Sequence, residues 1–206
     1  MAESERPQIY LITPSELELS SFPDLLARVL DSTEIACIRL ALSTRDEDKL
    51  SRIGDALRDV AHTRDVALVI AEHGLMVDRL GLDGVHLPDG ARSVRKWRKA
   101  LGEDAIVGAF CGASRHDGIT AGEAGADYVS FGPVGASGLG DGSVAEPALF
   151  QWWSEMIEVP VVAEGGLNED HVRTLCQTTD FFGFGQEIWT APDPVMALRG
   201  FVTAMG

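Results

Sequence analysis

The sequence predicts a (β/α)8 barrel, also called a TIM barrel, formed as one domain over residues 1–206. Eight short runs of apolar, β-branched or aromatic residues alternate with segments of helical spacing, which indicates a parallel sheet. The runs begin about 25 residues apart, enough for one strand and one helix each. No long linker, charge block or low-complexity stretch divides the chain. A barrel of this length is common as a single domain.

Each of the eight runs is predicted to be a buried strand of the sheet. Strands covered on both faces have near-continuous apolar sequences, and these runs fit that pattern. They are 8–13, 35–42, 66–71, 84–87, 105–110, 127–131, 159–163 and 180–185. Eight strands separated by helices favour a closed barrel over an open doubly wound sheet.

Helices are predicted between the strands from the spacing of apolar residues. Leu50, Ile53 and Leu57 recur three and four residues apart, as on one face of a helix. A further helix is expected over 147–157 because it opens with a proline, whose missing N–H costs nothing in a first turn. Another is expected over 168–176.

An internal repeat supports the same architecture. Asp83, Asp127 and Asp180 each follow a helix-to-strand turn and precede a strand-like run. Aspartate commonly accepts backbone hydrogen bonds in such turns. The three are therefore predicted to have a structural role at the N-terminal face, whereas chemistry belongs at the C-terminal ends of barrel strands.

The charge of the chain excludes two classes of partner. It has 17 lysines and arginines against 32 aspartates and glutamates, for a formal net charge of −15. Non-specific binding to nucleic acid or to an anionic membrane surface needs clustered basic residues. We expect neither partner, while a small anionic ligand remains compatible because backbone N–H groups can bind it.

Cysteine content and the N-terminus predict a cytoplasmic protein. Cys37, Cys111 and Cys176 are odd in number and widely spaced, which is typical of thiols kept reduced and lacks zinc-site spacing. Residues 1–6 are polar and acidic, unlike a secretory signal. No apolar run approaches the roughly 18 residues needed to span a bilayer.

The loops after the seventh and eighth predicted strands form a candidate anion site. Gly165 and Gly166 allow a ligand to approach the backbone closely, and they precede the start of a helix. Gly185 and Gln186 follow the last strand, and these two loops are the usual phosphate site of the fold. Glu187 opposes this interpretation unless its carboxylate points away. The alternative is that the glycine pair only makes a tight turn.

Further candidate ligand contacts follow the fifth and sixth strands. Gly132 opens a loop, 132–142, in which five of eleven residues are glycine. Such a loop favours a mobile flap over the barrel mouth, with a plain flexible loop as the alternative. Arg115 and His116 follow Ser114, a good helix cap, and are predicted to stand near the mouth. For His116, a solvated helix start is the alternative.

These motifs together resemble the thiamine phosphate synthase family, which also includes thiazole tautomerases. The similarity covers nearly the whole chain and rests on the order and spacing of short motifs. They are Tyr10-Leu11-Ile12-Thr13, Asp83-Gly84-Val85-His86-Leu87, Gly125-Ala126-Asp127-Tyr128-Val129, Phe131-Gly132-Pro133-Val134 and Val161-Val162-Ala163-Glu164-Gly165-Gly166-Leu167.

The resemblance implies a transferase of thiamine biosynthesis that joins a hydroxymethylpyrimidine diphosphate to a thiazole phosphate. In the family, diphosphate leaves with help from Mg²⁺ and basic residues, because negative charge builds up on it. The family has a Gln-x-Arg-x-Lys pattern in its second strand, and the corresponding residues here are Cys37-Ile38-Arg39-Leu40-Ala41. The resemblance therefore implies Arg39, the one basic residue kept from this pattern, as the catalytic candidate. Glu72 stands at the position of the metal-binding aspartate, and Asp89 is the substitute for a second acidic residue.

Two alternatives to this transferase stay open from the sequence. One is a non-catalytic or regulatory relative that binds a phosphorylated ligand. The other is an isomerase of the thiazole tautomerase type, although Pro133 stands where those proteins have a catalytic histidine. The sequence does not determine the oligomeric state, for which a homodimer is one alternative.

Overall fold

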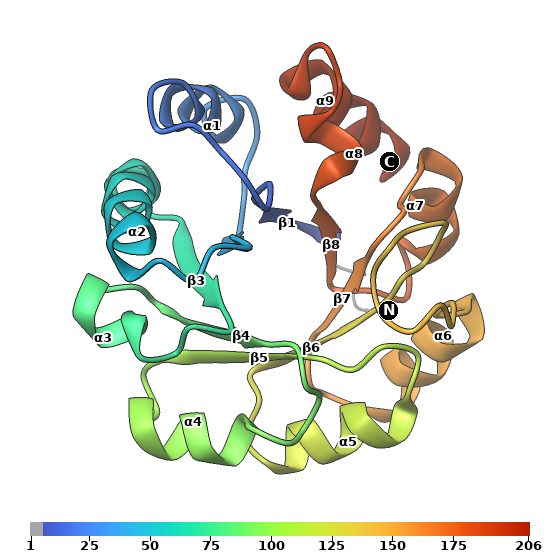
Figure 1. Ribbon diagram of the computed structural model, residues 1–206. Helices are drawn as coiled ribbons and strands as arrows, with labels where there is room; N and C mark the ends of the chain where they lie inside the picture. Colours follow the sequence, from blue (N-terminus) through green and yellow to red (C-terminus); the bar gives the residue numbers. More distant parts are fainter. Residues whose placement is uncertain (1–5) are drawn as a thin grey trace.

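Eight parallel strands close into a barrel in chain order, and the last strand pairs with the first. The computed structural model describes residues 6–206; residues 1–5, on which the argument against a secretory signal partly rests, lie outside the described residues. The helices form a ring around the strands (Figure 1). The predicted (β/α)8 barrel is therefore confirmed.

The strands and helices alternate around the ring until the C-terminal end, where two helices follow the last strand. The strands are β1 Gln8–Ile12, β2 Cys37–Leu40, β3 Ala67–Ala71, β4 Gly84–Leu87, β5 Ile106–Phe110, β6 Tyr128–Phe131, β7 Val161–Glu164 and β8 Phe181–Phe184. The helices are α1 Phe22–Leu30, α2 Glu47–His62, α3 Met76–Leu80, α4 Val94–Leu101, α5 Arg115–Glu123, α6 Pro147–Met156, α7 Glu169–Leu175, α8 Gln186–Trp189 and α9 Pro194–Ala204.

Every predicted run contains a strand, and the differences lie at the strand ends. The second run, 35–42, is reduced to β2, because the residues on either side belong to the connecting loops. Strand β7 instead continues one residue past the predicted run, to Glu164. That glutamate is 1% exposed, so a charged side chain is contained within the barrel.

The repeated aspartates have the structural role that the sequence predicts. Each accepts a hydrogen bond from the backbone N–H of a residue at or next to the start of the preceding strand. The donors are Leu68 N to Asp83 at 2.7 Å, Val107 N to Asp127 at 2.7 Å and Val161 N to Asp180 at 2.8 Å. These carboxylates tie neighbouring strands together at the N-terminal face, opposite to the end where ligands bind in this fold.

The apolar core has two layers, one outside the strands and one inside the barrel. The outer layer packs between strands and helices and contains most of the leucine, isoleucine and phenylalanine, including the fully buried Trp153 of α6. The inner layer is small and centres on Tyr10, Cys37, Val69, Tyr128 and Val162. Because strand side chains alternate in direction, the next inward residues toward the C-terminal end form the floor of the mouth.

Local caps begin the two helices at which the sequence predicts them. Ser114 accepts a hydrogen bond from the N–H of Asp117 at 3.1 Å, and Asn168 accepts one from the N–H of His171 at 2.8 Å. Both caps satisfy backbone donors that have no partner within the helix. Among residues 6–206, no helix has the length and apolar character needed to cross a membrane.

Candidate functional site

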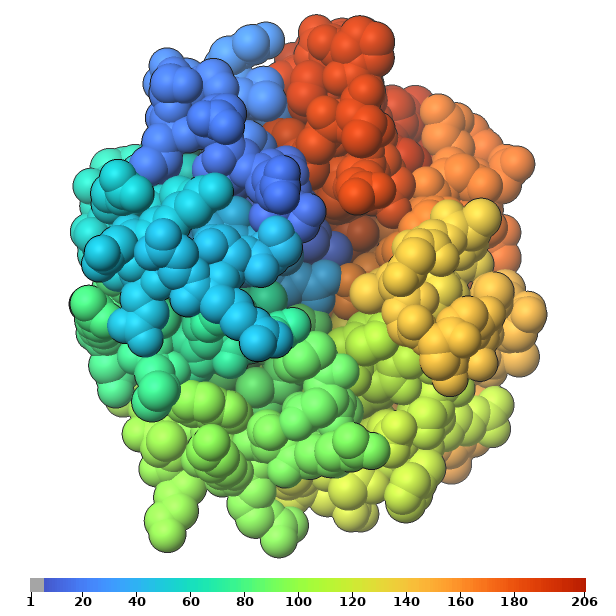
Figure 2. Space-filling view, viewed as in Figure 1, coloured from blue at the N-terminus to red at the C-terminus, as the bar shows by residue number. Residues whose placement is uncertain are grey.

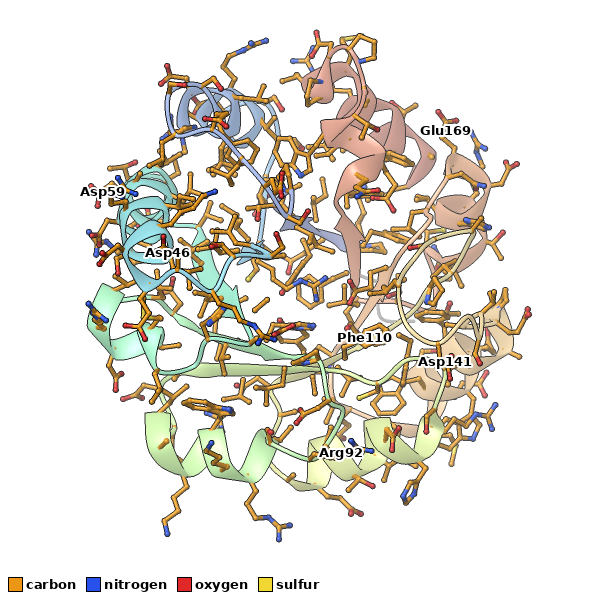
Figure 3. All side chains as sticks on the ribbon, in the orientation of Figure 1. Asp46, Asp59, Arg92, Phe110, Asp141 and Glu169 are labelled. Carbon is orange, nitrogen blue, oxygen red and sulfur yellow. The ribbon has the colours of Figure 1, made fainter. Side chains whose placement is uncertain are left out.

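A cavity of about 560 Å³ opens at the C-terminal ends of the strands. Figure 2 shows this face hollowed near the centre of the ring, between blue N-terminal loops, gold residues of the β6–α6 loop and red C-terminal helices. In Figure 3, the labelled Phe110, a lining residue at the end of β5, lies near the centre, whereas Asp59 and Glu169 lie on outer helices. The cavity is thus where chemistry is expected in this fold.

The cavity brings together six of the residues singled out from the sequence. They are Arg39, Glu72, Gly165, Gly166, Gly185 and Gln186. Four others do not belong to its wall, namely Asp89, Gly132, Arg115 and His116. The loops after β7 and β8 therefore do lie side by side at the mouth, as their positions in the sequence predict.

The glycine pair after β7 makes a turn that only glycine adopts readily. Gly165 and Gly166 have φ angles of 84° and 69°, which are left-handed values that strain other residues. The turn is joined to the β6–α6 loop, because Gly165 O accepts from Val134 N at 2.8 Å and from Gly135 N at 2.9 Å. Residues 136–139 of that loop also line the cavity. The loops after β6 and β7 thus form one wall.

The carboxylate of Glu187 lies on the backbone donors of the predicted anion site. One oxygen accepts from Gly166 N at 2.9 Å and Leu167 N at 3.2 Å, and the other accepts from Gly185 N at 2.8 Å. Glu187 is half-buried and lines the cavity. The carboxylate therefore points into the site and not away from it, so Glu187 still opposes the interpretation of these loops as an anion site.

Arg39 is held inside the barrel by an ion pair with Glu164 across the floor of the cavity. Both guanidinium Nη atoms contact this carboxylate, Nη1 at 3.2 Å from Oε1 and Nη2 against Oε2. Arg39 is 6% exposed. Burial alone would lower its pKa, but the Glu164 carboxylate raises the pKa overall. Arg39 is therefore a charged but already paired side chain.

A hydrogen-bonded chain runs from Arg39 into the barrel interior. Nη1 of Arg39 contacts His86 Nε2, His86 Nδ1 lies 2.9 Å from the Tyr128 hydroxyl, and that hydroxyl lies 2.6 Å from Tyr10 Oη. Because arginine can only donate, His86 Nε2 accepts and the ring proton is on Nδ1, which donates to Tyr128. Tyr128 then donates to Tyr10. Arg39 thereby determines the tautomer of His86.

The environment of His86 keeps its imidazole neutral. Burial and the nearby charge of Arg39 lower the pKa of His86 well below 6.5, so the folded protein does not take up this proton in mildly acidic solution. Burial likewise raises the pKa of Tyr10 and Tyr128 above the usual value. The chain of side chains is thus uncharged apart from Arg39 and Glu164, and we assign it a structural role.

A pH dependence of stability follows from the lowered pKa of His86. As the pH falls below about 6.5, the unfolded chain binds a proton that the folded chain does not. The free energy of unfolding should therefore fall by up to ~1.4 kcal/mol per pH unit from this residue alone. His86→Gln, which can still accept from Arg39 and donate to Tyr128, should lack this component in urea unfolding between pH 7 and 5.

The control for this prediction is His116→Gln, because His116 is exposed on α5. It should leave the pH dependence of unfolding unchanged. Parallel stability curves for wild type and His86→Gln would contradict the prediction.

Three of the four residues outside the cavity wall, Arg115, His116 and Gly132, lie in other surroundings. The Arg115 guanidinium stacks over the ring of Trp152 with 4.6 Å to the centroid, and His116 is exposed beside it on α5. Gly132 donates its N–H to Gly112 O at 3.1 Å. A Cβ at Gly132 would lie 2.3 Å from the carbonyl oxygen of Glu164, so a glycine there lets β6 and β7 approach closely.

The two candidate metal ligands differ in their surroundings. Glu72 is exposed at the end of β3, has a φ of 65° and lines the cavity. Asp89 accepts from Ser93 Oγ at 2.6 Å through one oxygen, while its other oxygen is buried without a hydrogen-bond partner. No group of three or more histidine, cysteine, aspartate or glutamate side chains suited to a metal ion is found in residues 6–206.

Sequence reasoning did not identify Glu164 as a residue of the cavity floor. The signal was present, because Glu164 directly follows the apolar run Val161-Val162-Ala163 of a strand that is covered on both faces. A carboxylate is almost never buried unless it is paired. That rule predicts a buried cation nearby, and Arg39 lies in the corresponding place on β2.

Comparison with known proteins gives a consistent result over nearly the whole chain. A family model described as thiamine monophosphate synthase matches residues 9–180. The thiamine-phosphate synthase of Rhodospirillum centenum is 36% identical over 201 residues, which cover 96% of this chain and 97% of that protein. That of Erythrobacter litoralis is 35% identical over 208 residues, which cover 98% and 97%.

The fold comparison agrees with the sequence comparison. The solved structure of thiamine phosphate pyrophosphorylase from Pyrococcus furiosus matches with a TM-score of 0.82 and 22% sequence identity, covering 96% of this chain and 95% of that chain. At this identity the match shows a shared barrel architecture.

Proposed function

The chain belongs to the thiamine monophosphate synthase family, and from this we propose that it is a transferase that joins a hydroxymethylpyrimidine diphosphate to a thiazole phosphate. The bond between the pyrimidine methylene carbon and the diphosphate oxygen breaks, and the thiazole nitrogen forms a new bond to that carbon. The products are thiamine phosphate and diphosphate. The observation that carries the proposal is the family match over residues 9–180. This range contains strands β2 to β7 and all of β1 except its first residue, and it ends just before β8.

The thiazole end of the substrate pair is proposed to bind at the loops after β7 and β8. Gly165, Gly166, Gly185 and Gln186 lie in one cavity wall, and backbone N–H groups of this wall point at a carboxylate. A set of donors that holds a carboxylate can also hold a phosphate. The proposal therefore uses these donors for the phosphate, and Glu187 must then move.

The pyrimidine diphosphate end is proposed to lie toward β2 and β3, where Arg39 and Glu72 line the cavity. Among the described residues of the cavity wall, Arg39 is the only lysine or arginine. Because Glu164 already pairs with it, Arg39 alone offers little charge to a leaving diphosphate. Its proposed role is to orient the diphosphate through the guanidinium N–H groups that do not donate to Glu164 or His86.

A Mg²⁺ ion is proposed to bind at this end of the cavity through Glu72. Mg²⁺ needs only one or two protein carboxylates, because water and substrate phosphates supply the other oxygens. Glu72 is an exposed carboxylate of the wall, and the unpartnered oxygen of Asp89 is the second candidate. When bound, the ion would neutralise the charge that develops on the departing diphosphate. Arg115, His116 and Gly132 stay candidate ligand contacts outside the described cavity wall.

Removal of the Glu72 carboxylate tests the metal proposal. Glu72→Ala should lower thiamine phosphate formation at limiting Mg²⁺ by at least about tenfold, because one lost ligand contact is worth more than ~1.4 kcal/mol. It should also abolish the enhanced water proton relaxation that Mn²⁺ gives when it binds the wild-type protein with the pyrimidine diphosphate. Asp89→Asn should reproduce both effects if Asp89 is a second ligand.

The control is Glu47→Ala, because Glu47 is an exposed glutamate on α2 whose carboxylate pairs with Arg79. It should change neither readout. Mn²⁺ binding by Glu72→Ala equal to that of wild type would assign the metal to another site.

The pairing of Arg39 with Glu164 favours a second candidate function, that of a non-catalytic protein that binds a phosphorylated ligand. A relative that binds a ligand without transferring a group needs no free cation for a leaving diphosphate. Incubation of wild-type protein with both substrates and Mg²⁺, followed by chromatography for thiamine phosphate, separates the two functions. Product formation supports the transferase, whereas ligand binding without product supports the binding protein. The tautomerase alternative is weaker, because Pro133 is buried and has no group for proton transfer.

A further inference from the structure

Glu187 is placed so that it occupies the donors a ligand anion would use. Its two carboxylate oxygens accept three backbone N–H groups from the loops after β7 and β8, at 2.8 to 3.2 Å. Hydrogen bonds to a charged acceptor are stronger than neutral ones. The carboxylate is therefore a well-bound internal anion and not a side chain that merely passes near the site.

A phosphate group and this carboxylate cannot use the donors together. Both would need the N–H groups of Gly166 and Gly185, and two anions a few ångströms apart repel each other strongly where water is partly excluded. A phosphorylated ligand must therefore displace Glu187. A ligand ending in a hydroxyl need not, because a hydroxyl can donate a hydrogen bond to the carboxylate.

The remainder of the wall does not offset the charge of Glu187. The described lining residues include the carboxylates of Glu72, Glu164 and Glu187 but only one cation, Arg39, which is paired with Glu164. His171 approaches the same turn, but its Nδ1 lies 3.2 Å from the carbonyl oxygen of Gly166. No described cation of the wall is free to bind a second anion beside Glu187.

We propose that Glu187 is a specificity-determining residue, which sets how strongly the site prefers a phosphorylated thiazole over the corresponding thiazole alcohol. The identity of the ligand rests on the proposed function. With the carboxylate in place, the phosphate gains donors only by expelling another anion, so the preference is small. Without the carboxylate, the same N–H groups are free, and the site becomes selective for phosphate.

Calorimetric binding of three probes to wild type, Glu187→Ser and Glu187→Ala tests this proposal. The probes are the thiazole phosphate, the thiazole alcohol and inorganic phosphate. Both variants should bind the thiazole phosphate at least about tenfold more tightly than wild type, a gain of ~1.4 kcal/mol. Affinity for the alcohol should rise by less than about threefold, or ~0.7 kcal/mol. Inorganic phosphate should raise the melting temperature of the variants more than that of wild type.

Glu158→Ala is the matched control for removing one negative charge from an acidic protein. Glu158 is exposed and precedes β7 at the N-terminal face, far from the cavity mouth. It should leave all three affinities unchanged. A similar gain for Glu158→Ala would overturn the proposal, since net charge alone would then explain the effect.

Further outcomes for the Glu187 variants also test the proposal. Unchanged or weaker binding of thiazole phosphate by folded Glu187→Ser and Glu187→Ala would also overturn the proposal. Glu187→Gln keeps the shape of the side chain and a neutral acceptor. It should therefore show a smaller gain in affinity for the thiazole phosphate, even if the shorter serine and alanine side chains change the loop conformation. If no thiazole binds any form but the variants gain affinity for inorganic phosphate, the proposed ligand is wrong, while the competition between Glu187 and a phosphate for the same donors is supported.

Discussion

Replacing Glu164 by leucine is expected to lower the free energy of unfolding by about 3–5 kcal/mol, because it leaves the Arg39 guanidinium buried without its counter-ion. Arg39→Met should have a cost of similar size, since it leaves the Glu164 carboxylate unpaired. Both residues are nearly inaccessible, with Arg39 6% and Glu164 1% exposed. Urea unfolding at neutral pH, followed by circular dichroism, measures each value.

The double variant Arg39→Met/Glu164→Leu distinguishes a buried ion pair from a loss of packing. It removes both charges and keeps similar volume, so its stability should lie within about 1–2 kcal/mol of wild type. The two single costs would then be strongly non-additive, as expected for residues in contact. Additive costs, or a Glu164→Leu variant as stable as wild type, would show that the pair does not contribute as described.

Replacing Gly166 by alanine is expected to reduce both ligand binding and thiamine phosphate formation by at least about tenfold, or ~1.4 kcal/mol. A Cβ at this position would lie 2.6 Å from the carbonyl carbon of Gly135 and 2.7 Å from the carbonyl oxygen of Ala136. The residue also has a φ of 69°, which costs a non-glycine residue about 1–2 kcal/mol. The wall formed by the loops after β6 and β7 should therefore open. Gly166→Asp should abolish binding, because it adds a charge beside Glu187.

Gly81→Ala separates the two causes of this loss. Gly81 ends α3 with a φ of 61°, and an added Cβ there would meet no atom within 4 Å. This variant should show the backbone cost alone, with binding unchanged and stability lowered by about 1–2 kcal/mol. Titration of each variant with the thiazole phosphate gives the comparison. Equal binding by Gly166→Ala and wild type would place the ligand elsewhere.

The architecture of this protein follows from features that are local in the sequence. A strand is recognised by a short apolar run, a helix by the spacing of residues such as Leu50, Ile53 and Leu57, and a turn by its aspartate or glycine. Asp83 and its two repeats could be assigned to the N-terminal face because a turn and the strand after it are adjacent in the chain. The same reasoning located the loops of Gly165 and Gly185 at one mouth, because all strands of a parallel barrel end on the same side.

The charges of the site could not be assigned in this way. The sequence offers Arg39 as a catalytic cation, but Glu164, 125 residues away, lies across the barrel from it and forms an ion pair. Glu187 could have pointed toward or away from the glycine turn, and only the packing of the β8 end against the β7 loop directs it onto the Gly166 N–H. The position of Arg115 directly after Ser114 predicted a place near the mouth, but in the structure its guanidinium stacks on Trp152 of the next helix.

The sequence by itself determined the barrel, the family and the end of the barrel that carries the site. Tertiary structure alone decided which charged side chains are free to meet a ligand. The physical reason is that strand and turn preferences depend on neighbouring residues, whereas the pairing of a buried charge depends on which distant carboxylate or guanidinium barrel closure brings within a few ångströms.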